Sequence, residues 1–425
     1  MLLGRNEVET AAVVDFDQFS LCGEGMANFC VSARHISSGI WLVWRFAKDK
    51  KTRMVSGVAG AVEARAFMAS VGLESLGRDF LRLPSLRHFS IADLALLAAA
   101  GHPLQDYFPP DLRPTLALQM PDFTRLPLLP APLPHLQSSP IITFELKPKQ
   151  ASKEPSLGPE SLCSNCLLQF GKVVEGRYAC LYDFCPSLLW TGQLGPMTTA
   201  LRHLIAIPHN NLKISVDGKL VHSEAFRLSE DELVAALLPP SSGAGLDHLL
   251  HLLASILTGS TGGGEFLERG DSVLGRLRAG QARDELGVGG AAALFATLPP
   301  ATAASLRRPH ALFAANAPLA QPTLGLLRAW SVSAALQDVS VLLSLCLAPE
   351  AREVSEEDAL PVRFAHLCVG QNRLRYAYRV AVVDVDAKAC KRAVRKQERL
   401  RELSAAMGEH EAVNGVLRRP CRTLP

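Results

Sequence analysis

Residues Ile141–Lys149 read IITFELKPK, a buried strand that ends in two lysines. Successive side chains of a strand point to opposite faces, so one face is apolar and the other carries Glu145, Lys147 and Lys149. Pro148 has no N–H group to donate to a neighbouring strand, so we expect the strand to end there or to lie at a sheet edge. A mostly apolar strand that directs two cations to one place predicts a binding site for an anion.

The composition limits which classes of protein are possible. The chain has 425 residues, 48% of them hydrophobic and 20% charged, which is enough for two domains or one large two-lobed domain with a sizeable core. The formal net charge is +3, from 44 Lys and Arg against 41 Asp and Glu. This balance argues against direct nucleic-acid binding, so the anion site must be local.

The sequence also indicates where the protein works. No apolar run reaches the ~18 residues of a membrane span, so we expect no membrane partner. The first residues, MLLGRNEVET, lack the basic and apolar regions of a signal peptide. Ten cysteines without such a signal favour a reducing compartment. We therefore expect a monomer in the cytoplasm, the nucleus or both.

The first part of the chain has an α/β pattern. Close glycines precede alternating apolar residues in Cys22–Ala33, and Ile40–Phe46 is a second predicted strand. Helices are predicted at Glu63–Val71 and Ile91–Ala100. Residues 102–140 contain many prolines and are predicted to form a linker. We place an N-terminal lobe at residues 1–125.

The second predicted lobe covers residues 126–425. A helix at Thr198–Ile207 precedes two strands joined by an Asp-Gly turn, and residues 230–330 are mostly helical around a mobile loop at about 258–265. Strands are predicted at Asp338–Ala348 and Tyr376–Lys388, followed by a basic helix. The chain is therefore predicted to be α/β in the wider α+β sense.

The predicted strand Tyr376–Lys388 ends in charged residues. Asp384, Asp386 and Lys388 alternate onto one face. Two carboxylates at a strand end suit a hard cation such as Mg²⁺, although a solvated strand end has the same pattern. Lys388 and Arg392 are four residues apart, which puts them on one face of the basic helix.

Residues Gly23–Asn28 read GEGMAN and lie between two predicted strands. Such a loop brings backbone N–H groups close to a phosphate, although a plain β-turn has the same composition. Arg45 on the next strand supplies a nearby cation.

Four cysteines are close in the sequence. Cys163 and Cys166 have zinc-ligand spacing, and Cys180 and Cys185 follow. The second pair is separated by four residues and few turn residues intervene. We therefore predict buried free thiols and keep a zinc knuckle as the alternative.

Together these segments resemble one family, the inositol-pentakisphosphate 2-kinases, which make inositol hexakisphosphate. The resemblance rests on motifs spread along the chain in family order: GEGMAN with VWRF, FELKPK, CSNCLLQFGKVVEGRY with CPSLLWTG, TTALRHLI with HNNLKI and DGKLV, QDVSVLLSL, and VVDVDAK. It implies a two-lobed fold distantly related to protein kinases. It also implies ATP and inositol 1,3,4,5,6-pentakisphosphate as substrates and Mg²⁺ as cofactor.

The resemblance implies roles for residues on the nucleotide side. Gly23 and Gly25 would cover the ATP phosphates, within a loop that includes Glu24 and Asn28. Arg45 would contact the same phosphates.

Asn210 would lie near the nucleotide and the metal. Asp384 would bind Mg²⁺, with Asp386 nearby. Asp338 would be the base that acts on the 2-hydroxyl, and Lys147 would hold the phosphate in transit.

Other residues would bind the inositide. The resemblance assigns this role to Lys149, Asn211, Lys213, Lys388 and Arg392.

The chain departs from the family pattern between Arg65 and Arg82, where a segment of the small lobe has no match and the N-terminal lobe is shortened. A second interpretation therefore stays open. The chain would then be a weakly active or inactive module that binds inositides.

Overall fold

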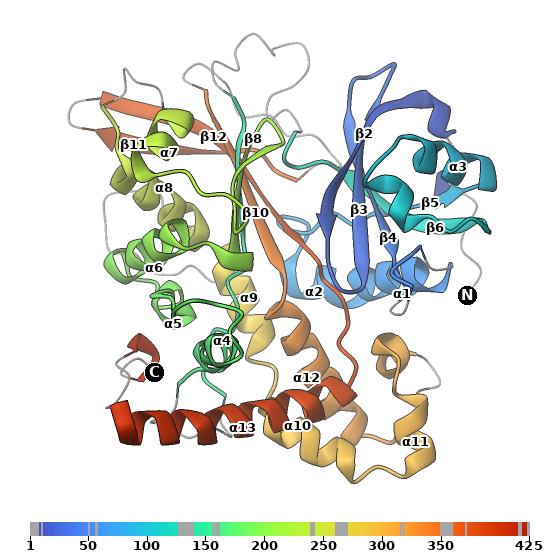
Figure 1. The fold of residues 1–425 in the computed structure, drawn as a ribbon, viewed down its shortest axis with the longest axis vertical. Coiled ribbons are helices and arrows are strands. Elements are labelled where there is room, and N and C mark those ends of the chain that lie inside the picture. Colours follow the sequence, from blue (N-terminus) through green and yellow to red (C-terminus); the bar gives the residue numbers. More distant parts are fainter. Residues whose placement is uncertain are drawn as a thin grey trace. The chain divides into compact units, whose positions relative to one another are not determined.

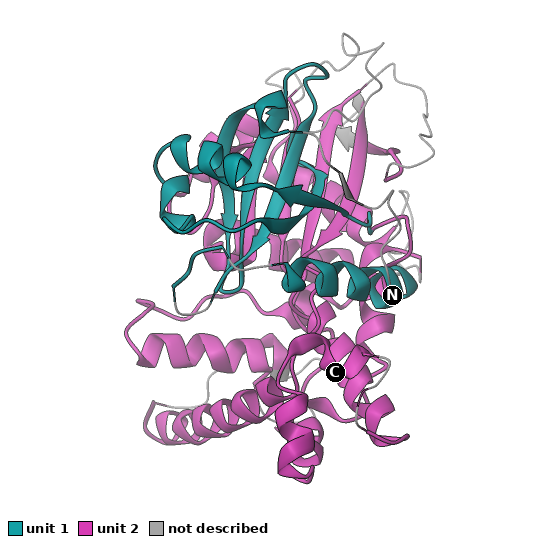
Figure 2. Cartoon of the chain, turned by 90° about the vertical axis from the view of Figure 1, so that its right-hand side faces the viewer, with its two compact units in different colours: residues 1–74, 81–127 teal, residues 75–80, 128–425 magenta. Residues whose placement is uncertain are grey.

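The computed structural model describes residues 8–9, 12–49, 52–55, 58–125, 140–154, 157, 162–238, 243–259, 271–314, 317, 319–348, 360–369, 372–414 and 419–422. The chain divides into two compact units (Figure 2). Unit 1 contains residues 1–74 and 81–127, and unit 2 contains residues 75–80 and 128–425. Each unit has a six-stranded, mainly antiparallel sheet with helices, which confirms the mixed α and β class. In these ranges no helix has both the length and the apolar character needed to cross a membrane.

Unit 1 is built on a sheet with strand order β1-β5-β6-β4-β3-β2 (Figure 1). Its strands are β1 (Val8–Glu9), β2 (Phe16–Glu24), β3 (Asn28–His35), β4 (Trp41–Ala47), β5 (Ser85–Phe89) and β6 (Thr115–Pro121). Its helical segments are η2 (Val13–Asp15), α1 (Ala59–Phe67), η3 (Met68–Gly72), α3 (Ile91–Ala99) and η4 (Leu104–Tyr107), and α2 (Leu73–Leu76) crosses the boundary between the units.

An aromatic core holds the unit 1 sheet together. Trp44 and Phe89 are fully buried and meet edge to face, with ring centroids 5.1 Å apart. The guanidinium of Arg87 is buried 4.5 Å from the Trp44 ring centroid, and its Nη1 donates to Gln119 Oε1 at 3.0 Å. Stacking on aromatic faces and this hydrogen bond offset part of the cost of burying the cation.

Two features of unit 1 test the predicted elements. The helix predicted at 91–100 is confirmed as α3, and a capping box between Ser90 and Asp93 sets its start. The predicted linker at 102–140 is wrong in part, because β6 lies inside it and pairs with both β4 and β5.

Unit 2 contains the second sheet, with strand order β11-β12-β10-β7-β8-β9. Its strands are β7 (Ile142–Leu146), β8 (Leu212–Val216), β9 (Lys219–His222), β10 (Ser340–Leu347), β11 (Arg363–Val369) and β12 (Asn372–Val383). Strand β7 is central, between β10 and β8, and most of its side chains are buried. The apolar pattern of the opening stretch therefore reflects burial inside a sheet.

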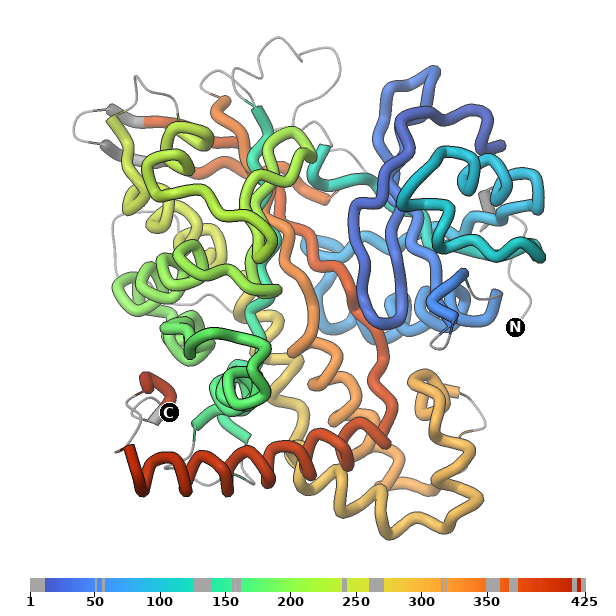
Figure 3. The backbone as a smooth tube through the Cα atoms, in the orientation of Figure 1, coloured from blue at the N-terminus to red at the C-terminus, as the bar shows by residue number. Residues whose placement is uncertain are grey.

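Helices complete unit 2. They are α4 (Ser164–Val174), α5 (Pro186–Leu189), α6 (Leu194–Ala206), α7 (Glu230–Leu237), α8 (Leu246–Thr258), α9 (Val273–Gln281), α10 (Gly287–Ala296), α11 (Pro300–Ser305), α12 (Thr323–Leu336) and α13 (Lys391–Asn414). Shorter 3₁₀ turns are η7 (His209–Asn211), η9 (Pro309–Phe313) and η10 (Pro420–Arg422). The basic helix is confirmed as α13, and it packs on α4 and α10 (Figure 3).

The two charged strand ends differ from their predicted form. Strand β7 ends at Leu146, and Lys149 has a left-handed φ of 64°, so Lys147 and Lys149 do not share a strand face. Strand β12 ends at Val383, and Asp384 has a φ of 63°. The predicted alternation of Asp384 with the residues after it is therefore also wrong.

The predicted hairpin is confirmed as β8 and β9. Its turn residues, Asp217 and Gly218, both have positive φ, as a tight turn between antiparallel strands requires. Most of the predicted mobile loop at about 258–265 lies outside the described residues.

Candidate functional site

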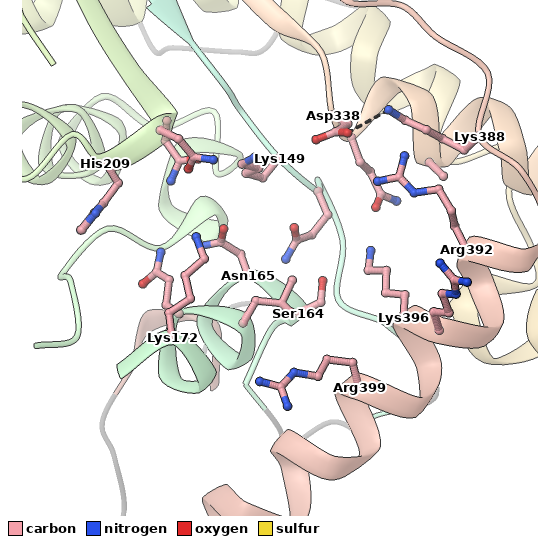
Figure 4. Close-up of a pocket in the computed structure, with 18 of the residues that line it drawn as sticks. Lys149, Ser164, Asn165, Lys172, His209, Asp338, Lys388, Arg392, Lys396 and Arg399 are labelled. Atoms are coloured by element: carbon pink, nitrogen blue, oxygen red, sulfur yellow. Dashed lines mark hydrogen bonds and ion pairs between the residues drawn. The ribbon is translucent and has the colours of Figure 1, made fainter. Parts of the chain in front are cut away.

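A cavity of about 610 Å³ lies in unit 2. Its lining comes from the segment after β7, from α4 and the residues that follow it, from η7, from the end of α12 and from α13 (Figure 4). Among the described residues, the cations of this lining are Lys149, Lys172, Arg177, Lys388, Arg392, Arg395, Lys396 and Arg399. The acids of the same lining are Glu175 and Asp338. The cavity is therefore strongly cationic although the chain is nearly neutral.

Asp338 lies between α12 and β10 and forms an ion pair with Lys388, whose Nζ is 2.8 Å from Asp338 Oδ2 (Figure 4). Burial alone would raise the pKa of the Asp338 carboxyl. The charges of Lys388 and Lys149 outweigh that effect and lower the pKa to about 2. Asp338 is therefore an ionised acceptor at neutral pH, with its second oxygen available for a further hydrogen bond.

Lys149 reaches the same cavity from the segment after β7. Burial, opposed by Asp338 and aided by the neighbouring cations Lys147, Lys172 and Lys388, lowers the pKa of its ammonium to about 8. A bound anion would favour the charged form of Lys149.

The 3₁₀ turn η7 brings polar side chains to the cavity. Asn211 is buried, its Oδ1 has no hydrogen-bond partner among the described residues, and its carbonyl oxygen accepts from Lys147 N at 2.9 Å. Asn210 is exposed and also lines the cavity. His209, with a φ of 42°, shares a hydrogen bond with Tyr182 through its Nδ1. Buried polar atoms are normally hydrogen-bonded, so the Asn211 amide oxygen could accept a hydrogen bond from a donor group of a bound ligand.

Four predicted residues of unit 2 lie outside this lining: Lys147, Lys213, Asp384 and Asp386. Glu145 and Asp384 share one neighbour, because Ser340 Oγ lies 3.0 Å from Glu145 Oε1 and 3.4 Å from Asp384 Oδ2. The second Glu145 oxygen is 3.5 Å from Lys213 Nζ.

Carboxylate oxygens are the ligands that Mg²⁺ prefers, so Asp384 fits the predicted metal role by donor type. Asp386 N donates to Asp384 O at 2.9 Å, which keeps the two acids on one tight turn.

Apart from Asn210, the predicted nucleotide-binding residues lie in unit 1, where β2 leads into the glycine loop. Gly25 N donates to Asn28 O at 2.8 Å and closes this loop. Glu24 forms ion pairs with Lys48, at 2.7 Å, and with Arg53. The Lys48 hydrogen bond, against the opposing effect of burial, lowers the pKa of Glu24 to about 2. The Glu24 side chain therefore anchors the loop internally.

The structure brings Asn28 and Arg45 together. With its amide oriented to satisfy both of its polar atoms, Asn28 accepts a hydrogen bond from Arg45 Nη2 at 2.6 Å. Arg45 is buried on β4, directly opposite Cys30 of β3.

Several cavity residues were not predicted. They are Lys172, Arg177, Arg395, Lys396 and Arg399. A periodic signal was available for α13, because Arg392, Lys396 and Arg399 are spaced i, i+4 and i+7 and share a face. No comparable signal identifies Lys172, whose place depends on how α4 packs.

A separate cluster of cysteines corrects the predicted set. Cys163, Cys166, Cys185 and Cys421 are all buried, and their sulfur atoms lie within 4.8 Å of one another. Cys180 is exposed and lies outside the cluster.

The chemistry of this cluster fits a metal ion better than four free thiols. Hydrogen bonds within the cluster, first from Cys163, lower the pKa of the Cys185 thiol, and those with Cys166 and Cys185 raise the pKa of the Cys163 thiol. The guanidinium of Arg419 is buried beside the sulfurs, with its Nη2 3.5 Å from Cys166 Sγ. Four close sulfurs with a balancing cation are a donor set typical of structural zinc.

Comparison with known proteins adds the following. The sequence model of the family described as inositol-pentakisphosphate 2-kinase matches residues 22–402. A Drosophila melanogaster protein named inositol-pentakisphosphate 2-kinase is 33% identical over 102 residues, which cover 24% of this chain and 16% of the relative. A Danio rerio protein of the same name is 35% identical over 115 residues, which cover 25% and 22%. The aligned segments thus span less than a quarter of each relative.

Proposed function

Because the chain belongs to the inositol-pentakisphosphate 2-kinase family, we propose that it transfers the γ-phosphoryl group of ATP to the 2-hydroxyl of inositol 1,3,4,5,6-pentakisphosphate. The product would be inositol hexakisphosphate. The observation that carries this proposal is the cationic cavity of unit 2, with its single ionised aspartate beside Lys388.

The charge of the cavity suits such a substrate. Five phosphates on one small ring need many cations at short range, and neutral pockets do not supply them. Lys388 and Arg392 would hold phosphates near Asp338, and Lys149 would hold another from the opposite wall. Asn211 would lie on the substrate side, where its amide nitrogen could donate to a phosphate oxygen.

Asp338 would act as the base. Its pKa of about 2 keeps it ionised, so it would accept a hydrogen bond from the 2-hydroxyl and receive its proton as the P–O bond forms. Such a weak base assists mainly by orienting the hydroxyl, because phosphoryl transfer depends on positioning and charge stabilisation. Lys147 would stabilise the charge on the phosphate in transit.

ATP and Mg²⁺ belong to the same proposal. In a two-lobed arrangement of the protein-kinase type, unit 1 would hold ATP through its glycine loop, with Gly23, Gly25 and Arg45 near the phosphates. Asp384, with Asp386, would hold Mg²⁺, which neutralises charge between the β- and γ-phosphates.

A second candidate is an inositide-binding module with weak or no transfer. The observation that favours it is the short connection between Arg65 and Arg82, where the family segment has no match. The base candidate Asp338 and the acid Asp384 favour a working kinase, because binding alone requires neither.

Incubation of the purified chain with ATP, Mg²⁺ and inositol 1,3,4,5,6-pentakisphosphate tests the proposal. Anion-exchange chromatography should resolve a hexakisphosphate product, and Asp338→Asn should lower its formation by roughly 10²–10⁴-fold. Binding of the pentakisphosphate without product would favour the binding module. Lack of both binding and product would reject both functions.

A further inference from the structure

An ion-pair cluster occupies the end of the cavity away from Asp338, where Arg399 lies (Figure 4). Glu175, just after α4, contacts two arginines of the lining. Its Oε1 pairs with Arg399 Nη2 of α13, and its Oε2 is 3.0 Å from Arg177 Nε. The single negative charge of Glu175 therefore offsets part of the positive charge of two arginines that line the cationic cavity.

Helix packing fixes the position of this cluster. Glu175 N donates to Gly171 O at 2.9 Å, so the acid continues the last turn of α4. A Cβ at Gly171 would lie 2.7 Å from Leu403 Cδ2 and 3.1 Å from Arg399 Nη2. The missing side chain at Gly171 thus lets α13 approach closely enough for Arg399 to reach Glu175.

Lys172 and Lys396, on the same wall, form no ion pair with an acid among the described residues, although Glu154 and Asp338 act on Lys396 from a distance. Lys172 Nζ bonds only to the neutral hydroxyl of Tyr178, at 2.9 Å, among the contacts of the described residues. Lys396 forms no hydrogen bond or ion pair with any described residue, although it lies one helical turn from Arg399. Glu175 thus offsets charge at this end of the cavity, and Asp338 does so at the other end through Lys388.

We propose that Glu175 is a specificity-determining residue that occupies, in the free protein, the place of a ligand phosphate on Arg399 and Arg177. An inositol polyphosphate that extends to this end must displace the carboxylate or tolerate its charge. Glu175 would thereby weaken the binding of inositides that carry a phosphate at this end of the cavity. Substrate and product of the proposed reaction share those phosphates, because the 2-position that distinguishes them would lie beside Asp338. The inference rests on the proposed function, because it takes the cavity to be the inositide site.

The exchange is feasible because the cluster is partly open to water. The side chains of Glu175 and Arg399 are 34% and 38% exposed, so solvent screens their pairing and its net strength is small. A phosphate group carries more charge than a carboxylate and offers more acceptor oxygens, so it competes well for two guanidinium groups.

Isothermal titration calorimetry with inositol hexakisphosphate, without ATP, tests the inference independently of turnover. Glu175→Gln keeps the shape of the side chain and removes its charge, so it should lower the dissociation constant by roughly three- to tenfold. Glu402→Gln is the matched control. Glu402 also contacts Arg399, at 3.4 Å from its Nη1, but does not line the cavity, so its removal should have a smaller effect.

A background without the two arginines tests whether Glu175 acts through them. With Arg399→Gln and Arg177→Gln already present, Glu175→Gln should no longer tighten binding. Equal gains from Glu175→Gln and Glu402→Gln, or a persistent gain in the background without the arginines, would overturn the inference while leaving the proposed function intact. Absence of binding by the unmodified chain would reject both.

Discussion

Among the residues of the cavity, Lys149 has a charge that depends on ordinary changes of pH. Its pKa of about 8 means that the ammonium is charged below that pH and loses its proton as the pH rises through it. A bound phosphate stabilises the charged form, so inositide affinity should fall as pH rises.

We predict that the dissociation constant of inositol hexakisphosphate increases roughly three- to tenfold between about pH 7 and pH 9. Calorimetry in one buffer series measures this change. Lys149→Met should bind more weakly and should lose most of the increase, because the ligand's own phosphates titrate equally in both proteins. A Lys149→Met profile parallel to that of the unmodified chain would assign the pH dependence to another group.

The two lysines of the opening stretch should have separable kinetic roles. Lys149 lines the cavity and would hold a phosphate that stays in place, so Lys149→Met should raise KM by roughly 10–100-fold. Lys147 would act on the phosphate in transit, so Lys147→Met should mainly lower kcat. Steady-state kinetics with varied pentakisphosphate separate these effects, and equal losses of kcat alone in both variants would contradict the division.

Sequence reasoning predicted part of the cavity at this scale. Lys149, Asn210, Asn211, Asp338, Lys388 and Arg392 were predicted site residues and share its lining. Spacing along a strand or helix pointed to Lys149, Lys388 and Arg392, whereas Asn210, Asn211 and Asp338 were selected by the resemblance to family motifs. Lys172 and Arg399 line one cavity because α4 and α13 pack together at Gly171, and such a contact between distant segments leaves no local pattern.

Among the secondary-structure elements, the cysteine cluster connects segments that are far apart in the sequence. Cys163 and Cys166 begin α4, Cys185 precedes α5, and Cys421 belongs to η10. Zinc held there would tie the last described residues to the helix that carries Lys172 and precedes Glu175.

We predict one zinc per chain by elemental analysis. Cys421→Ser should lose the metal and lower the melting temperature by several degrees, because a structural metal adds to the folding free energy. Cys180→Ser is the matched control, since Cys180 is exposed and outside the cluster. Less than one zinc per chain in freshly purified protein would contradict the prediction and would favour four buried free thiols.

Element prediction succeeded where one local rule dominates. The Asp217-Gly218 turn and the helix after Ser90 were predicted correctly, because turn conformation and a short apolar run act within a few residues. It failed for β6, because the surrounding prolines suggested a linker while pairing with β4 and β5 decided the outcome. It also extended β12 past Val383, since alternation cannot show where a partner strand stops.

For the whole molecule, the important quantity is the contrast between net charge and local charge. A formal charge of +3 gives little general attraction for anions. The cationic lining in unit 2 is local, so inositide binding should depend on salt through these residues and hardly at all through cations elsewhere on the surface.

We predict that affinity for inositol hexakisphosphate falls steadily as KCl is raised from about 0.05 to 0.5 M, because salt screens charges that remain partly open to water. The variant with Arg392→Gln and Lys396→Gln should bind roughly 10–100-fold more weakly at low salt and should show a shallower dependence. The control with Arg307→Gln and Arg308→Gln removes the same net charge from exposed residues outside the cavity. Calorimetry at four salt concentrations compares the three proteins. If the control lost as much affinity and as much salt dependence as the cavity variant, the attraction would come from the overall charge of the chain. That result would contradict the assignment of the cavity as the inositide site.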